Sequence, residues 1–215
     1  MTTWTILTGA QTTAGSIKNL TNVGDCDPAS IIEEAENYIY RKLRVRQMLA
    51  ETTGVFVVST TTGIGDAVDL PDDYLAAKTF QITGVNAAAL ERKTEAYVRG
   101  LWSYDGSGAR VLSKPRYFYA DGASLRFEVC ADQAYPWNML YYQQPAALSA
   151  SNTSNFLSTR GVRALLAACR GFVGEFRKDD VERDYWLKIA LAAVDDLNSE
   201  SDLEEGTANA AAVVV

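Results

Sequence analysis

Apolar residues recur at helical spacing in three long segments of the chain. The first segment follows Asp27-Pro28, a favourable helix start because aspartate caps the first turn and proline is tolerated just inside it. This pattern predicts a helix over residues 27–50. Two later segments, separated by Lys178–Asp180, predict an antiparallel helical hairpin over residues 158–198. The apolar positions of the first helix are Ile32, Ala35, Ile39 and Leu43.

Short alternating and β-branched runs fill residues 53–145 between these helices. Leu125, Phe127 and Val129 alternate with charged residues, so one face of that strand is expected to be buried. The strand follows Asp121-Gly122, a pair that accepts the positive φ values of a tight hairpin turn. We therefore predict an α+β protein: an α-helical bundle with an inserted small antiparallel β module.

The ends of the chain differ in composition from this predicted domain of residues 27–198. Residues 1–26 are rich in threonine and glycine, which predicts an N-terminal arm or a weak helix. Residues 199–215 are acidic and then rich in alanine and valine, which predicts a C-terminal tail.

Charge is placed unevenly along the chain, whose net charge is −7. No basic residue follows Lys188, and six acidic residues there account for all but one unit of the net charge. They are Asp195, Asp196, Glu200, Asp202, Glu204 and Glu205. The rest of the chain is nearly neutral, which argues against strong independent binding of nucleic acid.

One dense basic cluster lies near the end of the first predicted helix. It contains Arg41, Lys42, Arg44 and Arg46. A solvated helix terminus explains such a cluster, and so does an ionic contact with an acidic partner surface or with DNA.

The sequence contains few residues in arrangements that are typical of catalytic sites. The chain has no histidine, which removes the commonest general base, the usual catalytic triads and most zinc sites. The Asp72-Asp73 and Asp179-Asp180 pairs stand where aspartate commonly caps a helix or forms a turn. We therefore predict no enzymatic activity and no catalytic, cofactor-binding or metal-binding residue.

The cysteines indicate the redox compartment in which the protein is made, and the hydropathy pattern bears on whether it spans a membrane. Cys26, Cys130 and Cys169 fit neither a zinc spacing nor a disulfide framework, so buried free thiols formed in a reducing cytoplasm are expected. No apolar run reaches 18 residues, so no membrane span is expected.

Aromatic residues are concentrated in the predicted β module. They are Trp102, Tyr104, Tyr117, Tyr119, Trp137, Tyr141 and Tyr142. Such rings stack on sugars or bases when they are exposed, but in strands they more often form core and cross-strand contacts.

Three sequence blocks resemble the head-to-tail adaptor family of tailed bacteriophages, also called connector or tail accessory factor proteins. The first block, Ala35–Thr52, reads AENYIYRKLRVRQMLAET, and the second, Asp66–Gly84, reads DAVDLPDDYLAAKTFQITG. The third, Lys114–Val129, reads KPRYFYADGASLRFEV and is followed by the region Met139–Trp186. No single block is diagnostic, but their order and spacing cover most of residues 28–197.

The resemblance implies a structural virion protein at the head–tail junction, made in the cytoplasm of the host bacterium. It implies a twelvefold ring of identical subunits beneath the portal protein, with a downstream tail or nozzle protein below. DNA would pass through the central channel without sequence-specific binding. We expect the basic cluster and the tail to form the partner interface. The tail residues concerned are Asp202, Glu204, Glu205, Val213, Val214 and Val215.

The main alternative is a carbohydrate- or receptor-binding virion protein built on the aromatic β module. An exposed platform of tyrosine and tryptophan rings would favour that alternative, whereas burial of those rings would favour the connector.

Overall fold

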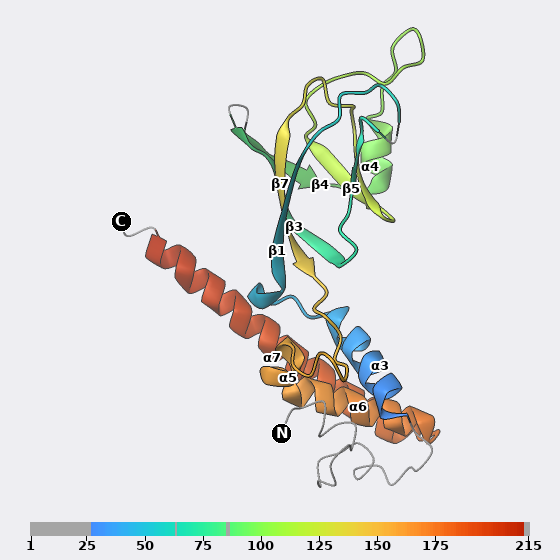
Figure 1. Ribbon diagram of the computed structural model, residues 1–215, viewed down its shortest axis with the longest axis vertical. Helices are drawn as coiled ribbons and strands as arrows, with labels where there is room; N and C mark the ends of the chain where they lie inside the picture. Colours follow the sequence, from blue (N-terminus) through green and yellow to red (C-terminus); the bar gives the residue numbers. More distant parts are fainter. Residues whose placement is uncertain (1–26, 63, 85–86, 213–215) are drawn as a thin grey trace. The chain divides into compact units, whose positions relative to one another are not determined.

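The computed structural model describes residues 27–62, 64–84 and 87–212, and side chains on the last helix as far as Glu204. The chain divides into two compact units, and Figure 1 labels many of their elements. The helical unit contains the described residues up to Met48 and those from Gln144 onward. The sheet unit contains Leu49–Gln143. The predicted arm at residues 1–26 and the residues Val213–Val215 lie outside the described part.

The helical unit is built around α6 (Val162–Phe176), which packs against both α3 (Pro28–Tyr40) and α7 (Asp180–Ala212). A short helix, α5 (Phe156–Thr159), precedes α6 and also contacts it. The core side chains are fully buried or nearly so, and the four apolar positions named for the first predicted helix are among them. They include Ile32, Ile39, Leu43, Leu165, Cys169, Ala190 and Val194.

Capping residues set the starts of two of these helices. The Asp27 carboxylate accepts a hydrogen bond from the Ala29 N–H at 3.1 Å, and Pro28 follows as the first helical residue. The Asp179 carboxylate accepts one from the Glu182 N–H at 3.0 Å. Lys178 turns the chain with φ 59°, so that α6 and α7 form a tight antiparallel hairpin.

The helix predicted over residues 27–50 is shorter in the structure. α3 ends at Tyr40, a 3₁₀ turn follows at Arg46–Met48, and β1 begins at Leu49. Arg44 explains the early end because its guanidinium donates to the carbonyls of Tyr40 at 2.9 Å and of Leu43 at 2.6 Å. These bonds satisfy carbonyl groups that the missing next turn would have used.

The last helix, in contrast, is longer than predicted. α7 continues through residues 199–212, which the composition had assigned to a tail. That segment contains no proline and is rich in alanine and glutamate, both strong helix formers.

In its described residues the sheet unit holds seven strands and one short helix, α4 (Glu95–Gly100). The strands are β1 (Leu49–Val55), β2 (Ala67–Asp69), β3 (Tyr74–Ile82), β4 (Ala88–Arg92), β5 (Tyr117–Asp121), β6 (Ser124–Phe127) and β7 (Pro136–Gln143). Their order is β1-β7-β3-β4-β5-β6-β2, and the sheet curls on itself. Between β5 and β6 the predicted hairpin is present, with Gly122 at φ 59°.

The prediction of a helical bundle with a small antiparallel β module was therefore wrong. The seven strands form a compact unit of their own, and the sheet is mixed because β4 pairs with β5 in parallel. A parallel pair needs a crossover connection, which here contains α4. A local pattern carries no information about the lateral neighbour of a strand, so the size and order of the sheet were missed. The start of β1 at Leu49 fell inside the predicted helix.

Aromatic rings fill the interior of the sheet unit. Phe80 lies at the centre, with ring centroids 5.6 Å from Phe127 and 5.3 Å from Trp137. Gly54 on the neighbouring strand makes room for Trp137, because a Cβ at this position would lie 2.4 Å from the indole ring. The cluster explains why the sheet unit has its own apolar core.

Truncating a core side chain of the helical unit should lower its stability strongly. Ile39 is fully buried on α3, so Ile39→Ala should cost about 2–5 kcal/mol of unfolding free energy through the cavity that it leaves. Leu166 on α6 is only half-buried, and Leu166→Ala should cost clearly less. Urea denaturation of both variants measures the difference, and equal losses would contradict this description of the core.

Candidate functional site

The predicted basic cluster lies on the turn that follows α3 in the helical unit. Arg41, Lys42 and Arg46 are exposed, whereas Arg44 is half-buried and directed toward the end of α3. Leu43 and Val45 alternate with these residues and are buried. The cluster is thus a partly anchored turn that presents three cations to solvent.

Helix α7 holds this turn by three hydrogen bonds. The Asn198 side chain accepts from the Arg44 N–H at 2.7 Å and donates to the Lys42 carbonyl at 3.1 Å. The Ser201 hydroxyl accepts from the Arg46 N–H at 2.9 Å. Residues more than 150 positions apart in the sequence are therefore adjacent, and the acidic end of α7 begins beside the basic cluster.

The acidic residues predicted for the interface lie just beyond this contact. Asp202 and Glu204 are exposed on α7, in the turn that follows the buried Ser201. Glu205 belongs to the same helix, but its side chain is outside the described part, as are Val213–Val215. The structure therefore brings the cations and the first acids of the predicted interface together, and leaves its apolar end undescribed.

Exposed apolar side chains of the α6–α7 hairpin were missed by the sequence analysis. The exposed fractions are 52% for Phe176, 82% for Val181 and 60% for Tyr185. Val162, Leu166, Trp186 and Ile189 line an open groove of about 510 Å³ between the same two helices. The width of the apolar stripe on α6 could have indicated this exposed surface, because the stripe is wider than two neighbouring helices can cover.

A buried carboxylate links α3 to the loop that follows the sheet unit. Glu36 is 2% exposed and accepts hydrogen bonds from the Leu148 N–H at 2.9 Å and from the Asn155 side chain. Burial raises the pKa of Glu36, and these two bonds oppose the rise.

Burial, with a smaller contribution from the Glu36 charge, also raises the pKa of the Cys169 thiol. Cys130 and Cys169 are buried free thiols as predicted, whereas Cys26 lies outside the described residues.

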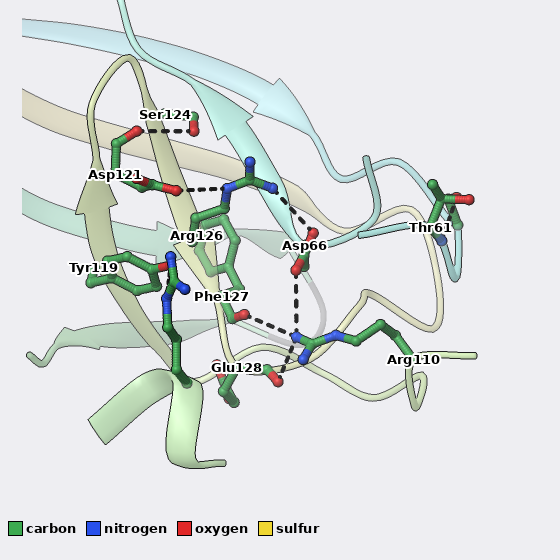
Figure 2. Close-up of polar contacts among 11 residues, drawn as sticks. Thr61, Asp66, Arg110, Tyr119, Asp121, Ser124, Arg126, Phe127 and Glu128 are labelled. Atoms are coloured by element: carbon green, nitrogen blue, oxygen red, sulfur yellow. Dashed lines mark hydrogen bonds and ion pairs between the residues drawn. The ribbon is translucent and has the colours of Figure 1, made fainter. Parts of the chain in front are cut away.

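The sheet unit contains a second buried charged cluster, shown in Figure 2. Asp66 is fully buried between Arg110 at 3.5 Å and Arg126 at 3.6 Å. Arg110 also donates to the carbonyls of Phe127 at 3.3 Å and Glu128 at 2.9 Å. Its guanidinium lies 4.4 Å from the centroid of the Trp102 ring.

This cluster stabilises the fold by linking separate segments of the sheet unit. Arg110 and Asp66 are closed to solvent, so no substrate reaches them. Their contacts attach the loop at residues 102–112 and the residue that precedes β2 to β6. Within the described residues no group of three or more histidine, cysteine or acidic side chains is placed to hold a metal ion. Asp73 accepts a hydrogen bond from the Tyr141 hydroxyl at 3.0 Å, and Asp179 is the helix cap described above.

The aromatic residues of the sheet unit form no continuous exposed platform. Tyr119, Trp137 and Tyr141 are buried, whereas Tyr104 is 54% exposed. The other three named rings, Trp102, Tyr117 and Tyr142, are half-buried. This distribution agrees with packing, and it removes the feature that would have favoured a carbohydrate- or receptor-binding protein.

Comparison with known families gives a match that covers nearly the whole chain. A family model described as SU10 adaptor protein matches residues 6–214. No curated protein matches the sequence.

Of the helices in the described ranges, none combines the length and the apolar character needed to cross a membrane.

Removing the carboxylate of Asp66 should destabilise the sheet unit. Asp66→Ala leaves the Arg110 charge buried without its partner, which should cost about 3–5 kcal/mol of unfolding free energy. Asp69→Ala, at an exposed position on β2, is the matched control and should be near neutral. Denaturant titrations that found similar small losses for both would contradict the structural role of Asp66.

The stability of the helical unit should depend on the ionisation of Glu36. Its folded-state pKa lies above the unfolded value of about 4.5, so the unfolded chain releases the proton first. Stability should therefore fall as pH rises from about 4.5 through the folded-state pKa, and then level off. Glu36→Gln should remove this contribution to the pH dependence, whereas Glu34→Gln, at an exposed position on the same helix, should keep it. Denaturation midpoints across this pH range measure the difference, and identical slopes would contradict the assignment.

Proposed function

Because the chain belongs to the SU10 adaptor protein family, we propose that it is the head-to-tail adaptor of a tailed bacteriophage. In this role it is a structural virion protein that forms a ring beneath the portal and connects the capsid to the tail. The ring contains twelve copies and continues the DNA channel, which DNA traverses without sequence-specific contacts. The observation that carries the proposal is the family match over residues 6–214.

The exposed surface of the helical unit supports a role in assembly. Phe176, Val181 and Tyr185 leave large apolar side chains in water on one helical hairpin. Three large apolar side chains exposed on one hairpin support the proposal that another protein covers it. In the sheet unit Val55, Val57 and Val58 are also at least half exposed, at the end of the edge strand β1. An uncovered strand edge is a further site at which another chain can pair.

The charged residues support contacts between unlike surfaces. Exposed cations of the basic cluster and exposed acids of α7 lie on one unit, so each copy offers both signs of charge. A heterologous contact, in which different patches of two identical subunits meet, closes into a ring when the rotation allows it. We propose that the basic cluster and residues 202–215 contribute to the contacts with the portal and with neighbouring copies.

The proposal predicts assembly that depends on the portal. The purified protein alone should be monomeric, because an adaptor with strong self-affinity would form rings away from the particle. Mixed with portal rings, it should bind with twelve copies per ring, as measured by native mass spectrometry or light scattering. Tyr185→Glu should reduce this binding while the unfolding free energy stays nearly unchanged, because Tyr185 is largely exposed.

Two outcomes would contradict this prediction. A closed ring that is stable at low concentration without portal would contradict assembly on a template. Virions that lack the protein and still carry normal tails would contradict the connector role itself.

A further inference from the structure

The groove between α6 and α7 has an apolar floor that the described chain leaves open. Val162 and Leu166 of α6 face Trp186 and Ile189 of α7 across a space of about 510 Å³. All four side chains are half-buried, so part of each apolar surface remains in water. A partner segment with small apolar side chains would remove that surface from water without steric conflict.

Two arginines flank this apolar floor. Arg163 and Arg170 lie seven positions apart on α6, about 10 Å along the same face of the helix. Arg170 stacks over the Trp186 ring with its guanidinium carbon 4.5 Å from the centroid. Neither guanidinium has a carboxylate partner in the part of the chain that the structure describes. The groove therefore selects a segment that carries acidic groups beside small apolar ones.

The end of α7 has this combination of side chains. Asp202, Glu204 and Glu205 are followed by residues 208–215, which read ANAAAVVV. No basic residue lies beyond Lys188 to oppose the attraction. The other segment outside the described residues fits less well, because residues 1–24 contain no acidic residue at all.

The end of α7 cannot reach the groove of its own chain. Ile189 lines the groove, and the helix continues from there to Ala212, which is 23 residues at about 1.5 Å each, or about 34 Å. The three residues 213–215 span at most about 11 Å when fully extended. Folding back would thus require unwinding several turns of α7, so residues 202–215 can enter such a groove only in another copy.

We propose that residues 202–215 of one copy dock in the α6–α7 groove of the next copy, with the acids on Arg163 and Arg170 and the Ala/Val residues on the apolar floor. This inference rests on the proposed ring, and it identifies a contact that joins neighbouring subunits. The contact is heterologous, since the groove and the docking segment are different surfaces of one chain. Each contact is weak alone, and ring closure supplies avidity.

Cysteine cross-linking on assembled particles tests the proposal directly. A chain that carries both Leu166→Cys and Val214→Cys should form disulfide-linked dimers and a ladder of larger oligomers under mild oxidation. Intramolecular bonds are excluded by the reach of α7, and Cys130 and Cys169 are buried. In the control, Val181→Cys replaces Leu166→Cys; Val181 is 82% exposed but does not line the groove, so no ladder should form.

The outcomes separate this inference from the proposed function. Normal particles whose Val214→Cys links only to the portal, or to nothing, would overturn the docking while leaving the adaptor role intact. Failure of the unmodified protein to enter particles at all would overturn the adaptor role first.

A binding measurement that needs no ring gives an independent test. A synthetic peptide of residues 199–215 should bind the full-length protein at low salt and change the fluorescence of Trp186. Arg163→Glu should weaken this binding by about three- to tenfold, because an exposed ionic attraction becomes a repulsion. Lys188→Glu, an exposed charge change on α7 that does not line the groove, should leave it unchanged. Equal weakening by both variants, or no binding, would overturn the proposal.

Discussion

The close approach of α7 to α6 is the constraint on which the helical unit depends. A Cβ added at Gly171 would lie 2.8 Å from the Leu187 side chain, and one at Gly174 would lie 2.8 Å from the Arg183 backbone nitrogen. Real Cβ atoms are not found this close to other groups, so only glycine permits the observed packing at these two positions. The two helices can therefore approach each other closely along one side of α6. The larger residues at the other side, such as Leu166, are left to border the open groove.

The position of α7 in turn holds the connection between α3 and β1. With α7 packed on α6, Asn198 and Ser201 reach the backbone of the turn at residues 42–46. These bonds satisfy polar backbone groups where α3 has already ended. The proximity of the basic cluster to the acids of α7 is thus a consequence of helix packing.

Buried carboxylates perform the same structural task in each unit. Glu36 accepts hydrogen bonds from the loop near Leu148, and Asp66 pairs with two arginines that reach it from distant segments. Each carboxylate ties together segments that local sequence preference would leave independent, at the cost of burying a charge. These acids look reactive in isolation, but their surroundings give them partners and exclude solvent.

The sequence alone determined the local elements, because helical and strand periodicity depend on neighbouring residues. It located the Asp27 cap, the Gly122 turn, the α6–α7 hairpin and most strands, and the order of its blocks indicated the adaptor family. Tertiary structure decided which strands pair, including the parallel β4–β5 contact, and therefore that the strands form a compact unit of their own. It also decided how the turn after α3 is held, since Asn198 and Ser201 bond to residues more than 150 positions away in the sequence. Periodicity could not predict the groove either. An apolar stripe shows that one face of a helix is apolar, but only the packed structure shows which part of that face stays uncovered.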